Sequence, residues 1–335
     1  MVSLKDIANI CGVSVATVSK ALNGQPDIGE ETREKIRRKA DEMGYFTNSA
    51  ARALKTNRTN NLGVLFVDES NRGLTHDFFA NVLNAFKSEA EKNGYDITFI
   101  NNNIGERPIT YLQHCRYRGV DGVFMACVDF YDDQIKEIAS SSLPSVSVDH
   151  VFPERPAIMS DNNTGIVELV DYAYSLGHRK IAYIYGEMTA VTEKRLSGFK
   201  AAAIRLGLKV PKEYIVKSAY YESELSYKAA TDLINLPDPP TCIIFPDDFS
   251  LVGGISAIKD AGLSVPDDIS IIGYDGILLS QIMNPKITTY KQDTAAMGRQ
   301  AAIKLIELIE KGSPEDNSVI SISGKMLKGE SVKKV

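Results

Sequence analysis

The sequence is poor in the residues that build metal centres and disulfide frameworks. Its 335 residues include four cysteines and four histidines, with no C-x-x-C and no H-x-x-x-H spacing. We therefore expect buried, unpaired cysteines and neither a metal ion nor a cofactor. No apolar run approaches the ~18–20 residues that span a bilayer. The N-terminal MVSLKD lacks the features of a secretory signal, which predicts a cytoplasmic protein.

The signatures of common enzyme classes are missing as well. The sequence holds no G-x-G-x-x-G, no P-loop, no G-x-S-x-G and no metal-spaced cluster. We therefore expect a protein that is not an enzyme, although an enzyme on an α/β body stays an alternative. Loss of a substrate in the presence of the purified protein would favour that alternative. A transport binding protein is a further alternative, but it requires an export signal.

The net charge of −5 hides an asymmetry along the chain. Residues 1–60 hold 10 Lys and Arg against 7 Asp and Glu, a balance of +3. The remaining residues hold 28 against 36, a balance of −8. A basic head on an acidic body is expected when only the head meets the phosphates of a nucleic acid.

The first 24 residues predict two short helices joined by a tight turn. An apolar stripe at i, i+3, i+4 and i+7 marks the first helix: Leu4, Ile7, Ala8 and Cys11. Gly12 can end this helix with a positive φ, and Ser14 can cap the next one. The second helix should bury Val18 and Leu22 and end at Asn23. This is the pattern of a helix-turn-helix unit, although a helical hairpin in an enzyme has the same spacing.

Further helices are predicted before the chain changes character. One should run from about Glu30 to Met43 and complete a headpiece over residues 1–46. A short helix capped by Asn48 follows within residues 47–61, and it is too short to be stable alone.

From Leu62 onward, strands alternate with helices, and we trace this pattern as far as Asp275. Such alternation predicts parallel sheets covered by helices on both faces. We expect two similar lobes within residues 62–335. The first should comprise about 62–160 and 293–320, and the second about 161–290 and 321–335. A ligand should then bind in the cleft between the lobes, beyond the carboxyl ends of the strands.

Several stretches, taken in order, resemble the lactose/galactose repressor (LacI/GalR) family of bacterial transcription regulators. The N-terminal stretches are LKDIANICGVSVATVSKALNG, ETREKIRRKADEMGY and NSAARALKT. Those of the body are SDNNTG, LGHRKIAYIYG, RLSGFKAA, PDDISIIGYD and TTYKQDTAAMG. Each is weak alone, but together they cover nearly the whole chain. The resemblance implies an all-α helix-turn-helix headpiece, a hinge helix and a two-lobed, periplasmic-binding-protein-like α/β body.

The function that the resemblance implies is repression of carbohydrate-utilisation genes. A homodimer would bind a pseudo-palindromic operator in double-stranded DNA, with an affinity controlled by a small effector in the cleft. The C-terminal residues 325–335 show no leucine heptad, so we favour a dimer over a tetramer. A catabolite-control-type regulator that responds to a phosphorylated carrier protein is the alternative within the family.

The resemblance also assigns DNA contacts. Base edges would be met by Val15, Ala16 and Lys20, and phosphates by Thr17, Ser19 and Asn23, with Ser14 as a cap first and a phosphate contact second. Burial in the headpiece core is the alternative for Val15. In the hinge, Leu54 would wedge between base steps of the minor groove. The accompanying hinge contacts are Asn48, Ala51 and Lys55.

The effector site is likewise implied by the resemblance. Its candidate residues are Phe78, Phe79, Asp149, Arg195, Tyr221, Asp247, Asp275 and Gln292. Arg195 would grip diols or a carboxylate with its rigid fork of donors, and Asp275 would accept hydroxyl donors. Ion pairs between the lobes are the alternative for the charged members. The set favours a small polyhydroxylated ligand, most simply a sugar. Ala126 and the dipeptide His76-Asp77 depart from the common sugar-binding pattern.

Overall fold

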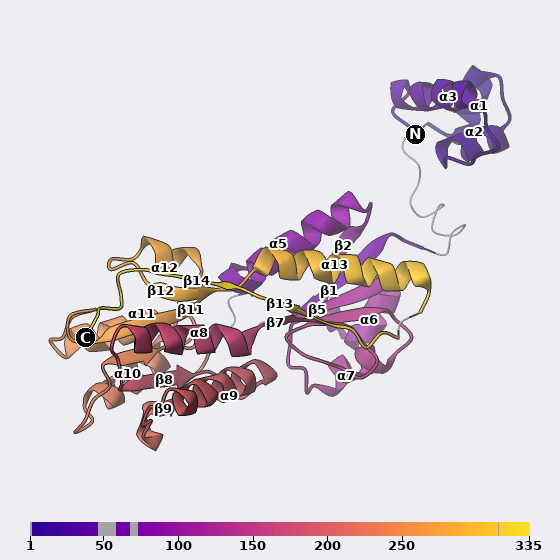
Figure 1. The fold of residues 1–335 in the computed structure, drawn as a ribbon. Helices are drawn as coiled ribbons and strands as arrows, with labels where there is room; N and C mark the ends of the chain where they lie inside the picture. The colour runs from indigo at the N-terminus through magenta and orange to yellow at the C-terminus, as the bar shows by residue number, and fades with distance from the viewer. Residues whose placement is uncertain (1, 46–57, 68–72, 314) are drawn as a thin grey trace. The chain divides into compact units, whose positions relative to one another are not determined.

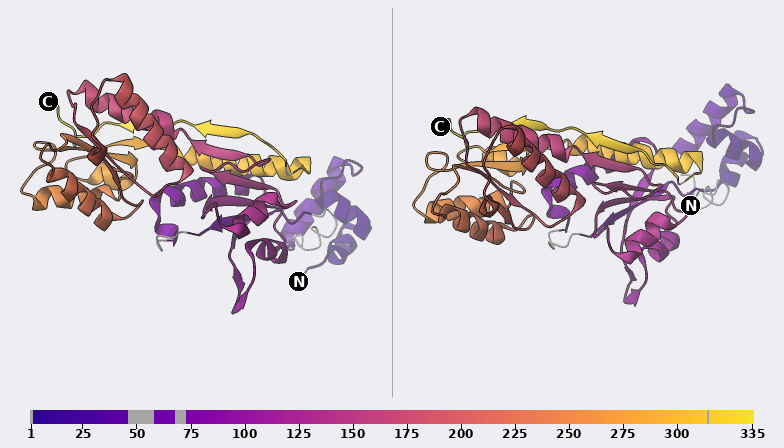
Figure 2. Two further views of the ribbon diagram at one scale, coloured as in Figure 1. Left: turned by 90° about the horizontal axis from the view of Figure 1, so that it is seen from below. Right: turned by 60° about the horizontal axis from the view of Figure 1, so that its bottom comes forward.

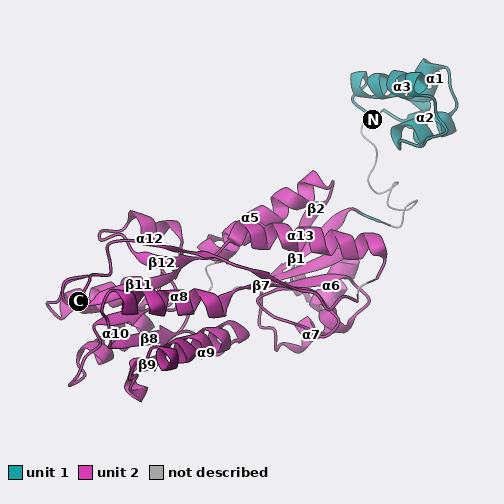
Figure 3. Cartoon of the chain, viewed as in Figure 1, with its two compact units in different colours: residues 1–59 teal, residues 60–335 magenta. Residues whose placement is uncertain are grey.

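The computed structural model describes residues 2–45, 58–67, 73–313 and 315–335. The chain divides into two compact units, residues 1–59 and residues 60–335 (Figure 3). The predicted hinge contacts Asn48, Ala51, Leu54 and Lys55 lie outside the described residues.

The first unit is a three-helix headpiece made of α1 (Leu4–Cys11), α2 (Val15–Leu22) and α3 (Glu30–Glu42). Gly12 adopts φ 71° and ends α1 in the left-handed conformation, as the sequence predicts. The three helices enclose a core that includes Ile7, Val18 and Ile36, all fully buried. The prediction for Leu22 was wrong in detail: Ala21 occupies the fully buried position, and Leu22 packs only partly against the core.

The second unit begins with a six-stranded sheet in the order β13-β7-β6-β5-β1-β2. Its strands pair in parallel and are β1 (Asn61–Phe66), β2 (Asp96–Ile100), β5 (Gly122–Cys127), β6 (Ser145–Val148), β7 (Ala157–Ser160) and β13 (Val319–Ile322). Helices α5 (Asp77–Lys92) and α13 (Thr294–Lys311) cover one face, and α6 (Tyr111–Arg118) and α7 (Asp133–Ser140) cover the other. A small hairpin, β3 (Asn103–Ile104) and β4 (Arg107–Pro108), precedes α6, and the turn η1 (Gly73–Thr75) precedes α5.

A second six-stranded sheet has the order β14-β12-β11-β10-β8-β9. Its strands are β8 (Ile181–Tyr185), β9 (Ile215–Lys217), β10 (Cys242–Ile244), β11 (Ser270–Asp275), β12 (Thr288–Lys291) and the antiparallel edge strand β14 (Lys325–Leu327). Helices α8 (Asn162–Ser175) and α9 (Ala190–Arg205) pack on one face, and α10 (Ser223–Ile234) and α11 (Leu251–Asp260) on the other. The short elements η2 (Lys212–Tyr214) and α12 (Leu278–Ile282) lie in loops.

The chain passes between the two sheets three times: from β7 to α8, from β12 to α13, and from β13 to β14. Helix α13 therefore returns to the first sheet and lies beside α5 (Figure 1). Gly298 permits this close approach, because a Cβ there would lie 2.1 Å from the carbonyl oxygen of Val82. The C-terminus ends beside the second sheet (Figure 2), where the Val335 N–H donates to Leu176. Each sheet and the helices that cover it form one lobe, and we call these the first and the second lobe in the order of the two sheets above.

Within the described ranges, no helix has the length and apolar character needed to cross a membrane.

Candidate functional site

Helix α2 presents a row of side chains that do not enter the headpiece core. The Ser14 hydroxyl accepts the N–H of Thr17 at 3.0 Å, so the predicted cap is confirmed. Val15 is 44% exposed and Ala16 is also exposed, which rules out the alternative of core burial for Val15. Val18, further along α2, is fully buried and anchors this helix to the headpiece core.

The polar side chains at the C-terminal end of α2 contact other residues of the headpiece. Lys20 Nζ lies 2.5 Å from the Asp27 carboxylate, and both side chains are about half exposed. The hydrogen bond from Lys20 lowers the pKa of Asp27. Asn23 Nδ2 donates to the carbonyl of Ser19 at 2.6 Å. Lys20 has three N–H donors, so it can keep Asp27 as a partner while it contacts a base or phosphate.

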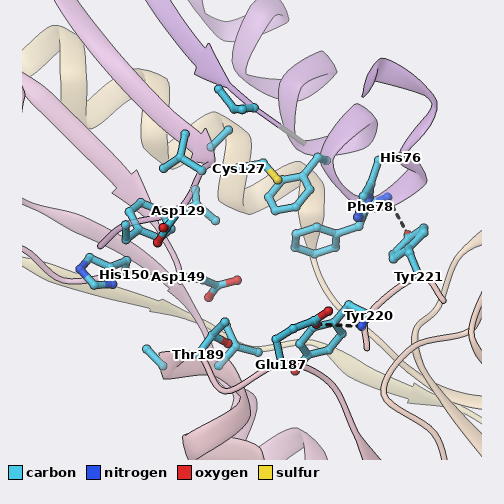
Figure 4. Close-up of a pocket in the computed structure, with 18 of the residues that line it drawn as sticks. His76, Phe78, Cys127, Asp129, Asp149, His150, Glu187, Thr189, Tyr220 and Tyr221 are labelled. Atoms are coloured by element: carbon cyan, nitrogen blue, oxygen red, sulfur yellow. Dashed lines mark hydrogen bonds between the residues drawn. The ribbon is translucent and has the colours of Figure 1, made fainter. Parts of the chain in front are cut away.

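A pocket of about 490 Å³ opens between the two lobes (Figure 4). Seven of the eight predicted effector residues line it: Phe78, Phe79, Asp149, Arg195, Tyr221, Asp275 and Gln292. They come from the start of α5, the ends of β6, β11 and β12, helix α9 and the segment before α10. Ala126, which departs from the sugar-binding pattern, also contributes to the wall. The volume falls in the range of small-molecule sites.

Three pocket residues have strained backbones. Asp149, Tyr221 and Asp275 adopt φ angles of 57°, 56° and 96°, in the region that favours glycine. Asp149 follows β6 directly, and Asp275 is the last residue of β11. Such conformations cost on the order of 1–3 kcal/mol each and concentrate at functional sites.

Arg195 lies in the wall of the pocket and already contacts several neighbouring groups. Its Nε donates to Asn162 Oδ1 at 2.8 Å and its Nη1 donates to the Pro246 carbonyl at 2.9 Å. Nη2 lies 3.9 Å from Asp275 Oδ1, and the guanidinium sits 3.6 Å from the centre of the Tyr274 ring. With only 3% exposure, Arg195 uses its fork mainly to fix the pocket wall.

Buried acceptors face the inner part of the pocket. Burial raises the pKa of Asp275 to about 7 and that of Asp149 to about 6. Gln292 Nε2 donates to Asp275 Oδ1 at 2.7 Å, and the Ser160 N–H donates to Asp149 Oδ1 at 2.8 Å. Among the described residues, no donor reaches Gln292 Oε1. Asp149 and Asp275 line the cavity, and their ionised carboxylates can accept hydrogen bonds there.

Asp247 is the predicted effector residue that does not line the pocket. Its Oδ2 accepts the N–H of Tyr221 at 2.9 Å, and its Oδ1 accepts the N–H of Ser250 at 2.7 Å. The first contact positions the segment that carries Tyr221, and the second holds the Asp247 carboxylate at the start of α11. Asp247 therefore acts on the pocket indirectly, through its hydrogen bond to Tyr221.

Several lining residues were not predicted. His76 lies with its ring 3.7 Å from that of Tyr221, and Phe130 stacks on His150 at 4.5 Å. The Glu187 carboxylate accepts the N–H of Tyr220 at 2.9 Å. Phe130 comes shortly after β5, so the strand-end rule that found Asp149 could also have found it. His150 and Glu187 likewise come shortly after β6 and β8, whereas His76 precedes α5 and carries no comparable signal.

The cysteine expectation holds in part. Cys11, Cys115 and Cys242 are buried and unpaired, but Cys127 at the end of β5 is partly exposed and lines the pocket. Across the described part of the chain, no group of three or more His, Cys, Asp or Glu side chains could hold a metal ion.

Comparison with known proteins gives two family matches. Residues 3–48 match "Bacterial regulatory proteins, lacI family", and residues 170–332 match "Periplasmic binding protein-like domain". The probable HTH-type transcriptional repressor ExuR of Bacillus subtilis (strain 168) is 31% identical over 323 residues, covering 96% of this chain and 95% of the relative. The HTH-type transcriptional repressor PurR of Pasteurella multocida (strain Pm70) is 31% identical over 339 residues, or 99% of each chain.

Two solved structures share the fold over nearly the full length. The lac repressor dimer bound to operator and the anti-inducer ONPF has a TM-score of 0.79 at 23% identity, with 99% of each chain covered. The complex of the transcriptional regulator CelR with cellobiose has a TM-score of 0.70 at 21% identity, with 99% of this chain and 100% of that chain covered.

Proposed function

The chain belongs to the lacI family of bacterial regulatory proteins and is a DNA-binding transcriptional regulator, and from this premise we propose how it works. A homodimer binds a pseudo-palindromic operator through two headpieces and represses carbohydrate-utilisation genes in the cytoplasm. A small polyhydroxylated effector, a sugar, binds between the lobes and sets the affinity for the operator.

The observation that carries this proposal is that one chain has two separate candidate binding surfaces, the exposed side of α2 and the pocket between the lobes. Helix α2 offers Val15 and Ala16 to solvent from a rigid three-helix frame, as a recognition helix requires. Apolar side chains at these positions can contact a thymine methyl, and Lys20 can donate to guanine. Ser14, Thr17, Ser19 and Asn23 are assigned to phosphate contacts, which set the register on the duplex.

The hinge residues complete the DNA-binding surface in this proposal. Leu54 wedges between base steps of the minor groove, and Ala51 is small enough for a close approach. Asn48 caps the short helix, and Lys55 reaches a phosphate. A helix this short needs its twin and the duplex in order to persist, so it serves as an order–disorder switch.

The pocket supports a free small molecule as the effector. Its wall combines aromatic side chains with a few converging polar groups, the usual composition of a small-molecule site. Both lobes contribute, so a bound ligand stabilises one relative arrangement of the lobes. A phosphorylated carrier protein would instead act on an outer surface, and this is the weaker candidate. Among the fold relatives, CelR is known in complex with cellobiose, which supports a sugar here.

Control of operator affinity follows if the ligand distinguishes two lobe arrangements. The ligand can shift that equilibrium only by its differential affinity for them. A change in the angle between the lobes of the two subunits would alter the spacing of the two linkers. That spacing decides whether the two hinge helices pair in the minor groove.

Selection of bound duplexes from a random DNA pool by the full-length protein tests the DNA-binding part. We expect an enriched sequence with two inverted half-sites. Enrichment of a single unrepeated site would contradict dimeric, pseudo-palindromic recognition. A thermal-shift screen with sugars and sugar phosphates tests the ligand part, because a ligand raises stability by RT ln(1 + [L]/Kd).

A further inference from the structure

The wall of the ligand pocket is rich in carboxyl groups. Asp129 and Asp149 belong to the first lobe and Glu187 to the second (Figure 4), and Asp275 adds a fourth carboxyl group from the second lobe. Among the lining residues that the structure describes, Arg195 is the single lysine or arginine. A ligand in this cavity is therefore surrounded by more negative than positive groups.

The charge of Arg195 is already paired with a carboxyl group of the same wall. Two of its nitrogens already donate to Asn162 and to the Pro246 carbonyl, and the third lies 3.9 Å from Asp275. Its side chain is 4% exposed, so the guanidinium cannot turn toward a ligand without breaking these contacts. Among the described lining residues, a phosphate or carboxylate would therefore meet four carboxyl groups and one guanidinium, which already has Asp275 beside it.

A second observation concerns hydrogen-bond polarity. Gln292 is 3% exposed, and within the described residues its Oε1 has no donor. The amide nitrogen of the same side chain is committed to Asp275 Oδ1 at 2.7 Å, which fixes the direction of the amide. The carboxyl groups of Asp149 and Asp275, which line the cavity, are the wall's acceptors for donors of a ligand.

The remaining wall is aromatic. Phe78 and Phe79 lie at the start of α5, and the rings of His76 and Tyr221 lie 3.7 Å apart. Aromatic faces attract cations as well as the apolar faces of sugars. Burial also holds the pKa of Asp275 at about 7, and a positive group beside it would favour the ionised carboxylate.

We propose that the effector is a polyhydroxylated molecule with a protonated amino group and without phosphate or carboxylate, as in an amino sugar. An ammonium group offers three donors and no acceptor, which matches a wall of acceptors and carboxylates. A phosphate brings about −1.5 to −2 charges and further acceptors, which match neither. This inference rests on the proposed function and narrows its ligand class.

The test compares matched sugars on the full-length protein at pH 7 by titration calorimetry. The series are glucosamine, glucose, glucuronate and glucose 6-phosphate, together with the corresponding galactose compounds. In at least one series we expect the amine to bind ~10-fold more tightly than the neutral parent, because charge-assisted hydrogen bonds are about twice as strong as neutral ones. The acid and the phosphate should not bind. Tighter or equal binding of the neutral or anionic members would overturn the proposal.

Substitutions of pocket carboxyl groups test whether these groups cause the preference for the amino sugar over its neutral parent. Asp275→Asn keeps the shape of the side chain and should abolish the preference for the amine. Glu187→Gln, at the exposed rim of the pocket, should reduce it and carries little risk to folding. Asp133→Asn is the control, because this carboxylate is 97% exposed on α7 and lies outside the pocket. An unchanged preference in both pocket variants would contradict the assignment.

The outcomes separate this inference from the proposed function. Binding of a neutral or anionic sugar leaves the effector-controlled regulator intact and removes only the charge assignment. If no compound of either series binds, the assignment is wrong, and DNA binding by the same preparation decides the regulatory function independently.

Discussion

The backbone N–H of Phe78 donates to the hydroxyl of Tyr221 over 3.4 Å. Phe78 belongs to α5 on the first lobe, and Tyr221 belongs to the segment that precedes α10 on the second. This hydrogen bond joins the lobes at the wall of the pocket, next to the ring of His76, which is tilted by 34° against that of Tyr221. A ligand that contacts the same residues therefore acts where the two lobes are already linked.

Removal of this hydroxyl should loosen the link between the lobes. In Tyr221→Phe the ring stays but its hydrogen bond is lost, which costs about 1 kcal/mol. We expect effector affinity to fall ~5-fold and operator binding to respond less to the effector. Calorimetry and fluorescence anisotropy measure the two effects. Tyr227→Phe is the matched control, since it removes a hydroxyl bonded to Asp260, away from the pocket. Equal losses in both variants would contradict the role of Tyr221.

Two roles of Ser14, cap and phosphate contact, can be separated by paired substitutions. Ser14→Ala removes the bond to the Thr17 N–H and should destabilise the headpiece by about 1 kcal/mol. Ser14→Asp retains a capping oxygen and should preserve stability. Its negative charge should nevertheless weaken DNA binding. Thermal unfolding and gel shifts test this, and normal DNA affinity in Ser14→Asp would exclude a phosphate close to this side chain.

The hinge proposal predicts a separation of functions. Leu54→Ala should weaken operator binding by at least ~10-fold, because the kink in the duplex loses its wedge. Effector affinity should stay within twofold, since Leu54 lies outside residues 60–335. Gel shifts and calorimetry on one preparation measure both. Ile204→Ala, at an 81% exposed position of α9, is the control. Loss of effector binding with intact operator binding would refute the hinge assignment.

The buried carboxyl of Asp275 predicts how stability depends on pH. Burial raises its pKa from 3.8 to about 7, so the folded state binds the proton more tightly than the unfolded state. The associated stability is present below pH 3.8 and is lost as the pH rises through 7. Relative to Asp275→Asn, the ligand-free wild type should therefore lose unfolding free energy between pH 5 and 8, by at most about 1.4 kcal/mol per pH unit. Urea unfolding at several pH values measures the difference. A difference independent of pH would contradict the burial argument.

The headpiece and most strands and helices up to Asp275 could be predicted because their signals are local. Gly12 and Ser14 mark a helix end and a helix start by their own conformational preferences. The positions of α13, β13 and β14 depend instead on long-range pairing. β13 joins β7, and β14 pairs with β12, so no window of sequence contains both partners.

The pocket illustrates the same limit. Asp149 and Asp275 could be placed because they end buried strands. The hydrogen bonds of Arg195 could not be predicted, since its partners Asn162 and Pro246 lie 33 and 51 residues away in the sequence. Cys127 was expected to be buried, but the end of β5 opens into the cavity. Side chains in a cleft are set by the packing of two lobes, which periodicity does not encode.

Operator binding measured with and without a pocket ligand tests the central claim most directly. The measurement is fluorescence anisotropy of full-length protein on the duplex recovered by selection, with the compound of highest affinity present or absent. We predict that the ligand changes operator affinity about 5–150-fold, the usual range of allosteric coupling. We also predict that Asp275→Asn reduces this change. Failure to bind double-stranded DNA of any sequence at low salt, or an affinity that the bound ligand leaves unaltered, would contradict the account.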